Sequence, residues 1–207
     1  VGISAFEGCE RLTSVKFNSD IFNEYMFKNC TKLQNVEFND ETTITSIPVG
    51  FFQNCSSLGK LNLIDENLSN LTSIGAYAFE NTNFVNIELT NNQSYIGEGA
   101  FQNSSNLESV TLNVSTNDIT KYIGSHAFYN CPKLQNVSIG SNVSNTSTIG
   151  ESDENSWAIR NGIFEHCTNL KNVDLKNNVI GVEMFKNCIN LEEIEIPASI
   201  KYIGSDA

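Results

Sequence analysis

One pattern of apolar residues recurs along the whole chain and limits its possible folds more than any other sequence feature. Each copy reads small or apolar residue, Phe, two residues, Cys, two residues, Leu, two residues, Val, one residue and a further apolar residue. The repeat phenylalanines are Phe6, Phe27, Phe52, Phe79, Phe101, Phe128, Phe164 and Phe185. Most of their spacings, which run from 21 to 36 residues, fall within the roughly 20–29-residue period of one class of stacked repeat protein. The pattern predicts a solenoid of about eight coils.

The end of each copy predicts a short strand. In the first copy Val15 and Phe17 are apolar and Lys16 between them is charged, so alternate side chains point inward and outward. Such strands stack in parallel, about 4.8 Å apart, into one continuous sheet. The phenylalanines form a buried column on the opposite side of the core, each worth about 1.5–3 kcal/mol. No coil can bury its own apolar face, so every coil requires neighbours.

Two further columns predict the rest of each coil. An apolar residue precedes each Phe by five positions and is often followed by Gly, as in Ile74-Gly75 and Ile96-Gly97. We interpret this pair as a short extended segment that ends in a tight turn. We also expect a brief helical or 3-10 turn around the Phe, ended by a residue in the left-handed region. The residues at that position tolerate a positive φ and are Gly8, Asn29, Asn54, Asn81, Asn103, Asn130, His166 and Asn187.

These columns closely resemble the BspA-like leucine-rich repeats. The motif Ile-Gly-x-x-Ala-Phe-x-x-Cys-x-x-Leu-x-x-Val-x-Ile-Pro is nearly whole at 123–139 and 191–197. The resemblance covers essentially residues 1–207 as a single, mostly β domain. It implies an extracellular or cell-surface protein of mucosal bacteria or protist parasites that adheres to host matrix, mucin or other cells. The chain departs from the motif in three ways: Pro is mostly missing after the strand, the fourth copy is shortened, and the seventh carries an inserted loop at about 150–158.

Charge and hydropathy narrow the possible partners. The formal net charge is −12, which disfavours binding to nucleic acid and to anionic membranes. No apolar run approaches the roughly 18 residues that cross a membrane, so we expect no membrane insertion within this chain. No signal peptide is visible and both ends fall within a repeat, so we expect a fragment of a longer protein.

The cysteines and histidines predict structural roles, and we expect no enzyme activity and no cofactor. All six cysteines occupy one repeat column, where Thr82 and Ser104 replace them in two copies. We therefore interpret them as buried free thiols, because their parallel stacking fits a disulfide torsion poorly. The Cys-x-x-Cys spacing of zinc sites is absent, as are catalytic triads and phosphate loops. We expect His166 to be a turn residue and His126 to be solvated, without a shared functional site.

The outward side chains of the predicted sheet are the first candidate ligand-binding surface, because solenoids commonly bind partners there. The central outward column is Lys16, Glu37, Asn62, Glu88, Thr111, Ser138, Asp174 and Glu195. Beside it runs a second polar column, Ser14, Asn35, Lys60, Asn86, Ser109, Asn136, Asn172 and Glu193. The columns are interpreted either as a solvated sheet face or as a polar platform for protein or glycan ligands. Because large apolar anchors are missing, we expect weak binding that is strengthened by avidity.

The inserted loop is a second candidate surface. It contains Trp157, the only tryptophan, close to Glu151, Asp153 and Glu154. A loop tryptophan can anchor a contact, or it can fold back over the core. The acids lack the Asp-x-Asp-x-Asp-Gly spacing of a calcium loop, so we expect no metal there. The main alternative to an adhesive module is a structural scaffold that self-associates weakly through its open sheet edges.

Overall fold

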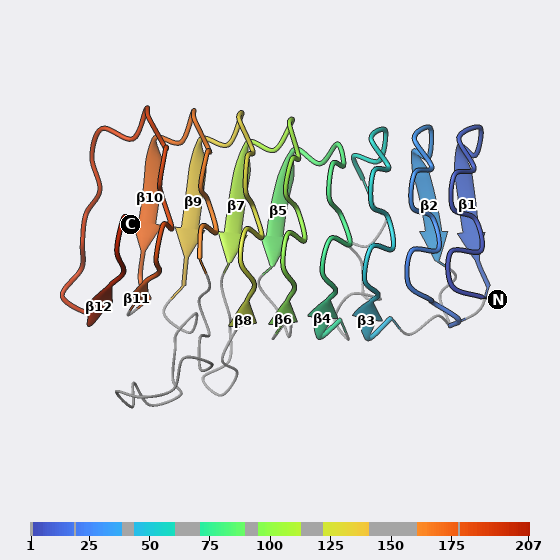
Figure 1. Cartoon of the computed structure of the whole chain (residues 1–207), viewed down its shortest axis with the longest axis horizontal. Helices are drawn as coiled ribbons and strands as arrows, with labels where there is room; N and C mark the ends of the chain where they lie inside the picture. Colours follow the sequence, from blue (N-terminus) through green and yellow to red (C-terminus); the bar gives the residue numbers. More distant parts are fainter. Residues whose placement is uncertain are drawn as a thin grey trace.

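In the computed structural model the chain winds into a solenoid whose coils stack from one terminus to the other (Figure 1). The structure describes residues 2–18, 20–38, 44–60, 71–89, 95–112, 122–140, 161–177 and 179–207. Every pairing between described strands is parallel. The predicted fold class, a solenoid of parallel stacked strands, is confirmed.

Four-residue strands form the first side of the solenoid at positions that the repeat motif predicts. Strands β10, β9, β7 and β5 form one sheet in that order, and β1 pairs with β2. The register keeps the motif aligned, since Val110 lies opposite Ile87 in one neighbour and Val137 in the other. Inward and outward columns are therefore preserved from coil to coil. The strands are β1 (Ser14–Phe17), β2 (Asn35–Phe38), β5 (Asn86–Leu89), β7 (Ser109–Leu112), β9 (Asn136–Ile139) and β10 (Asn172–Leu175).

The expected number of eight coils is slightly too high when coils are counted by these strands. Six copies carry a four-residue strand in the part of the chain that the structure describes. The strand expected in the third copy falls at 61–63, outside the described residues. In the eighth copy the segment 191–196 forms no regular strand. That segment leads into Pro197, which has no amide proton to donate to a ladder.

A second side consists of the predicted short extended segments. They are β3 (Ser46–Ile47), β4 (Ser73–Ile74), β6 (Tyr95–Ile96), β8 (Tyr122–Ile123), β11 (Val179–Ile180) and β12 (Tyr202–Ile203). The first four form one sheet in sequence order, and the last two pair with each other.

The glycines after these segments have a different role from the one expected. A Cβ on Gly97 would lie 2.3 Å from the backbone nitrogen of Ala76, in the preceding coil. Equivalent backbone clashes, at 2.4–2.6 Å, arise at Gly75, Gly124 and Gly204. None of these glycines has a positive φ. Close approach between coils, rather than turn geometry, therefore requires glycine here.

The third side, which we call the turn side, contains two left-handed columns. All eight residues predicted to have a positive φ do so, from Gly8 to Asn187. A second left-handed column was not predicted. Eight of its nine members lie two positions before a repeat Phe, and the ninth is Asp206. Its members are Ser4, Tyr25, Gly50, Tyr77, Gly99, His126, Gly162, Glu183 and Asp206.

Hydrogen bonding on the turn side explains why the expected helical turn does not form. The amides of Ser4, Phe6 and Gly8 donate to the next coil at Glu24, Met26 and Lys28. The intervening amide of Glu7 donates within its own turn to Ser4, and that of Cys9 donates to Phe6. Alternate amides thus donate to the neighbouring coil. In a continuous helix these amides would donate within their own segment instead. No helix occurs among the described residues.

The core lies between the three sides, and the repeat phenylalanines run through it as a continuous stack. All eight rings are in sequential contact, with centroids 5.2–5.8 Å apart and interplanar angles of at most 23°. The stack continues from Phe128 to Phe164 at 5.4 Å, although this is the longest repeat spacing. The predicted aromatic column is confirmed, with Phe6 at its N-terminal end partly exposed, and extra residues in a coil do not interrupt it.

Where a four-residue strand and the following two-residue strand are both described, the length differences between coils fall at one corner, between the end of the first strand and the start of the second. Leu89 and Tyr95 flank a short connection there, whereas Leu112 and Tyr122 flank a longer one. From the two-residue strand to the four-residue strand the repeat has nearly constant length, because each position in that part contacts its counterpart in the next coil.

Candidate binding face

The four-residue strands present the predicted outward columns on one surface, which we call the sheet face. Lys16 lies in register with Glu37 on β1 and β2. Farther along, Thr111 lies opposite Glu88 on one side and Ser138 on the other. All of the described members are at least partly exposed, including Asp174 and Glu195. Asn62 and Trp157 lie outside the described residues, so their positions stay predictions.

An open hollow of about 460 Å³ lies on part of this face and is formed by β7, β9, β10 and the segment 193–195. It gathers four residues of the central outward column, and Lys16, Glu37 and Glu88 do not line it. The sequence predicted that these columns face outward, but it did not indicate which of their residues line a hollow. The hollow is lined by Ser109, Val110, Thr111, Asn136, Val137, Ser138, Lys171, Asn172, Val173, Asp174, Glu193 and Glu195.

Side-chain hydrogen bonds between coils fix part of the hollow. Asn172 Nδ2 donates to Asn136 Oδ1 at 2.7 Å. Ser138 Oγ donates to Asp174 Oδ2 at 3.3 Å, and the same oxygen is 3.1 Å from Lys176 Nζ. These bonds limit side-chain rotation, so part of the entropy cost of binding a ligand is already met. The motif gave no sign of Lys176, because its position after the strand is not a repeat column.

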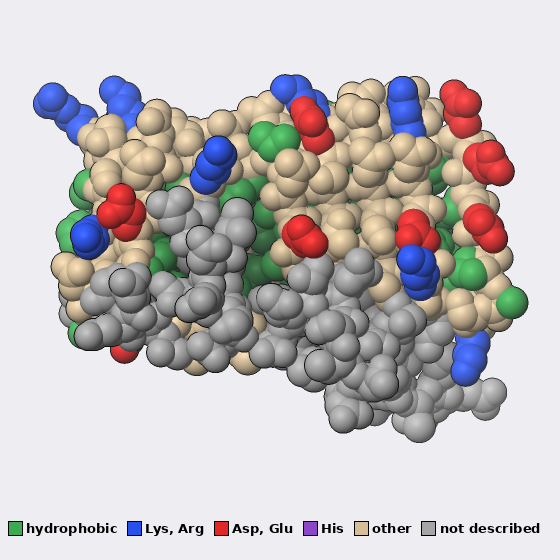
Figure 2. Space-filling view, turned by 180° about the vertical axis from the view of Figure 1, so that it is seen from behind, with side chains coloured by type: hydrophobic (Ala, Val, Ile, Leu, Met, Phe, Trp, Pro, Cys, Tyr) green, Lys and Arg blue, Asp and Glu red, His purple; other side chains and the backbone are tan. Residues whose placement is uncertain are grey.

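The hollow has an excess of acidic groups. Asp174, Glu193 and Glu195 line it, against Lys171 as the lining cation. No ion pair involves Glu193 or Glu195 in the described parts of the chain. Figure 2 shows one face of the molecule, where acidic side chains (red) gather toward one end. The surface can donate and accept hydrogen bonds and favours cationic groups on a ligand.

The cysteine column joins coils from within the turn side, as free thiols. Five thiols each lie within hydrogen-bond distance of the carbonyl oxygen of the repeat Phe in the preceding coil, at Sγ–O distances of 3.1–3.5 Å. Burial raises the pKa of Cys30 to about 11 and that of Cys188 to about 12. All six cysteines are free, and Cys9 is the exposed one. The expectation of buried free thiols is confirmed for the other five.

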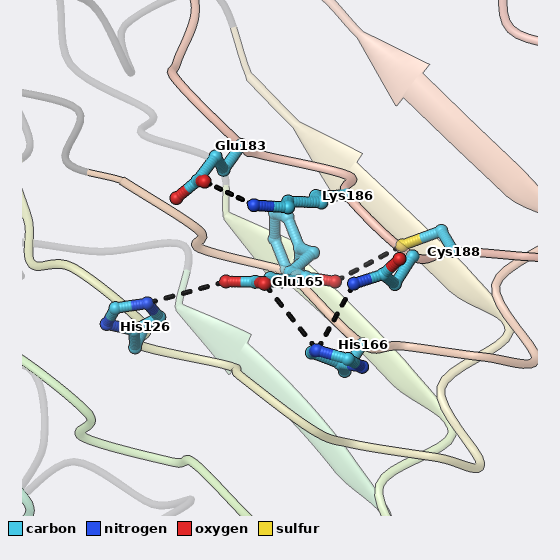
Figure 3. Close-up of polar contacts among 8 residues, drawn as sticks. His126, Glu165, His166, Glu183, Lys186 and Cys188 are labelled. Atoms are coloured by element: carbon cyan, nitrogen blue, oxygen red, sulfur yellow. Dashed lines mark hydrogen bonds and ion pairs between the residues drawn. The ribbon is translucent and has the colours of Figure 1, made fainter. Parts of the chain in front are cut away.

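A cluster of ionisable residues also lies on the turn side (Figure 3). Glu165 is mostly buried, and its two carboxylate oxygens are each 3.5 Å from an imidazole Nε2, one of His126 and one of His166. His166 is a left-handed turn residue as expected. His126 is also left-handed, and its side chain is partly covered rather than fully solvated. The two histidines thus share a carboxylate, which their spacing in the sequence did not indicate.

The surroundings of the two histidines do not form a metal site. Within the described residues, no group of three or more His, Cys, Asp or Glu side chains is arranged to hold a metal ion. The ring of Tyr129 contacts both imidazoles, at centroid distances of 5.2 and 5.3 Å. The described parts of the chain also contain no helix with the length and hydropathy needed to span a membrane.

Comparison with protein families identifies the repeat. The model of the BspA-type leucine-rich repeat region matches in six copies, over residues 1–73, 37–152 and 72–207. The chain belongs to the BspA-type leucine-rich repeat family. Membership makes this solenoid a repeat-protein module for binding or scaffolding, and such repeats are typically non-enzymatic. Among curated proteins, none matches the sequence.

Solved structures of bacterial leucine-rich repeat proteins share the fold. A leucine-rich repeat protein of T. pallidum has a TM-score of 0.58 at 21% identity, over 88% of this chain and 72% of its own. One from Eubacterium ventriosum has a TM-score of 0.57 at 18% identity, over 94% of this chain and 65% of its own. A leucine-rich cell surface protein of Faecalibacterium prausnitzii has a TM-score of 0.51 at 20% identity, over 98% and 58%. This chain is therefore shorter than each of these relatives.

Proposed function

We propose that this BspA-type domain is a non-enzymatic binding module displayed at a cell surface, where it adheres to host matrix, mucin or other cells through its sheet face. The observation that carries the proposal is the polar hollow formed by β7, β9, β10 and the segment 193–195. The exposed sheet residues of a repeat solenoid form its natural binding surface, and the hollow lies among them. The Faecalibacterium prausnitzii relative is described as a cell surface protein, which supports the location.

The chemistry of the hollow favours a protein or glycan ligand with exposed amides, hydroxyls or cationic groups. Its lining offers Ser, Thr and Asn side chains beside three carboxylates. No aromatic side chain lines it, so the large desolvated anchors that dominate tight interfaces are missing there. We therefore expect weak binding by one domain, with dissociation constants of about 10 µM or weaker. Multiple copies on a surface would strengthen attachment through avidity.

Binding to immobilised matrix proteins, mucins and epithelial cells tests the proposal, with the domain multimerised on beads. The hollow variant carries Asp174→Lys and Glu195→Lys. The matched control carries Glu37→Lys and Glu88→Lys, which makes the same change in charge on the same face but outside the hollow. We expect the hollow variant to lose at least about tenfold in binding and the control to retain most of it.

Each other outcome contradicts a definite part of the proposal. Equal losses in both variants would show that overall charge, rather than the hollow, controls attachment. Unchanged binding in the hollow variant would move the site to another surface. If the native multimer bound none of the tested surfaces, the adhesive function would be rejected, and a structural scaffold would become the better explanation. Binding is also measured at raised salt concentration. Salt weakens long-range attraction between exposed charges more than it weakens direct contacts inside the hollow.

A further inference from the structure

One edge of β10 has no strand beside it, although a further coil follows. β10 pairs with β9 on one side and ends its sheet on the other. In a parallel sheet, successive residues direct their backbone groups to opposite edges of the strand. The amides of Asn172 and Lys176 donate to the coil that contains β9. Those of Val173 and Leu175, which alternate with them, therefore face the open edge.

The following coil does not supply the missing backbone partner. In earlier copies the two residues after the repeat Leu donate to the neighbouring coil, and Lys171 and Asn172 both donate to the carbonyl of Gln135 in this way. The equivalent residues of the eighth copy are Glu192 and Glu193. Within the described residues, neither of them donates a backbone hydrogen bond to the coil of β10. Figure 1 shows this part of the chain passing beside β10 as a plain trace without a strand.

Two residues of this passing segment show that it does not join the sheet. Pro197 occupies the repeat position from which Lys176 donates to the previous coil, and proline has no amide proton to donate. Ile196 continues the inward column of Ile139 and Leu175, but it is 52% exposed whereas they are 0% and 5% exposed. The open edge of β10 thus keeps strand geometry without a strand partner in the described structure, and such an edge is a template for pairing.

The side chains around this edge define the strand that fits it. Val173, Glu193 and Glu195 line the hollow. Both glutamates are exposed, and in the described parts of the chain neither takes part in an ion pair. A strand beside β10 would direct alternate side chains outward, next to these carboxylates, and the others inward, next to Val173 and Ile196. Cationic residues that alternate with apolar residues match both sides.

We propose that the open edge of β10 binds an extended peptide segment of a partner protein, in which Lys or Arg alternates with apolar β-branched residues, as an additional strand. In this mode of recognition main-chain hydrogen bonds supply affinity and side chains supply specificity. This class of partner rests on the proposed function, since it specifies what the hollow binds. A glycan lacks the regularly spaced backbone amides and carbonyls that a strand edge pairs with. A second copy of this chain, with its net charge of −12, has the wrong charge for the carboxylates.

Binding of a labelled, end-blocked eight-residue peptide of alternating Lys and Val to the full chain tests the proposal. Two matched peptides carry N-methyl groups on the backbone nitrogens of either the Lys or the Val residues, so each loses the donors of one strand edge and keeps its charge. We expect at least one methylated peptide to bind about tenfold more weakly, or worse, because it loses several hydrogen bonds. Equal binding by all three peptides would overturn strand pairing and leave charge attraction as the cause.

Two pairs of matched variants test the protein side of the contact. Val173→Pro removes an amide that faces the open edge and keeps the ladder to β9, whereas Val173→Ala keeps the amide. Glu193→Gln/Glu195→Gln removes the carboxylates of the passing segment, and Glu37→Gln/Glu88→Gln makes the same change outside the hollow. We expect the first member of each pair to weaken peptide binding about tenfold and the second to retain it. Equal binding within both pairs would overturn the proposed contact.

Hydrogen exchange in the native protein gives a readout that needs no variant. Saturating Lys/Val peptide should slow exchange at the amides of Val173 and Leu175 about tenfold or more, because pairing protects them. The amides of Asn172 and Lys176 are already bonded to the coil of β9 and should change little. Bound peptide without slower exchange at Val173 and Leu175 would reject the added strand.

These measurements distinguish the added strand from the proposed adhesive function. If mucin glycans bound in the hollow and the Lys/Val peptide did not bind, the added strand would be rejected and adhesion through the hollow would stand. If the peptide bound as expected but the multimerised domain attached to no matrix protein, mucin or cell, the peptide site would stand and the adhesive function would be rejected.

Discussion

At the scale of single residues, the backbones of neighbouring coils pack directly against each other. The glycine column that follows the two-residue strands lets one coil approach the next without an intervening side chain. At Gly97 and Gly124 a Cβ would come within 2.4 Å of the preceding backbone, a separation that side-chain rotation cannot relieve. In the first copy Gly2 occupies the same column, but nothing lies within 4 Å of its Cβ position. Gly2 is therefore a matched control for substitutions in this glycine column.

Gly97→Ala should therefore lower the free energy of unfolding by about 1–3 kcal/mol, because the methyl group forces two coils apart. Gly2→Ala should change it by less than about 0.5 kcal/mol. Chemical denaturation followed by circular dichroism measures both. A neutral Gly97→Ala would mean that the coils separate easily, and that their close approach is incidental.

The buried thiols give a second residue-scale prediction, which concerns alkaline pH. Burial raises the pKa of Cys30 to about 11 and that of Cys188 to about 12, from an ordinary thiol value of 9.0. Between pH 9 and about 11 the unfolded chain releases these protons and the folded chain keeps them, so the free energy of unfolding falls as pH rises. Denaturation series should show a shallower fall in Cys30→Ser/Cys188→Ser. Serine fits the column, since Ser104 is fully buried there. Identical slopes would contradict the prediction.

At the scale of the elements, the local sequence predicted part of the backbone conformation of the turn side but not its hydrogen bonds. Asn, Gly and His before the Cys column indicated a left-handed residue, and every one has a positive φ. The second left-handed column was missed because only three of its nine members are glycine, and Tyr77 or Glu183 carries no intrinsic preference for that region. The prediction of a helical turn was wrong, because local conformational propensity does not indicate that alternate amides donate to another coil.

The asparagines at this position also bond to each other along the turn side. Asn130 Nδ2 donates to Asn103 Oδ1 at 2.8 Å, and Asn54 Nδ2 donates to Asn29 Oδ1 at 2.9 Å. Asn103→Val should cost about 1–2 kcal/mol, because a β-branched residue is disfavoured at a positive φ. Asn103→Gly should cost less than half as much, since it loses the side-chain bond but keeps the conformation. Thermal unfolding of the two variants tests this order, and equal losses would assign the effect to the hydrogen bond alone.

At the scale of the whole molecule, contacts in the phenylalanine stack couple the stability of each coil to that of its neighbours. The repeat pattern was enough to predict the solenoid, its parallel strands and the polar columns of the sheet face. It could not predict the hollow, since that depends on how the side chains of four coils pack together. It also missed the carboxylate between His126 and His166, because one histidine lies in each left-handed column and only one column was recognised.

Phe101→Ala should show the coupling between coils. Phe101 is buried, and its ring stacks on Phe79 at 5.2 Å and on Phe128 at 5.2 Å. Its removal should cost about 3–5 kcal/mol and lower the denaturant slope, because the two halves of the array then unfold less cooperatively. Phe6, which is 42% exposed, supplies the comparison, and Phe6→Ala should leave the slope unchanged. Hydrogen exchange would locate the uncoupled halves. An unchanged slope for Phe101→Ala would show that other contacts maintain cooperativity.

The corner between the four-residue and two-residue strands has a consequence for how such a chain evolves. Each coil combines a portion of nearly constant length, which contacts its counterparts, with a connection whose length differs from copy to copy. Selection can therefore lengthen or replace one connection while the phenylalanine stack continues, as it does from Phe128 to Phe164. The same corner is the natural place to graft a foreign peptide or a small domain. A family built in this way can vary the lengths of these connections and still keep the same arrangement of coils.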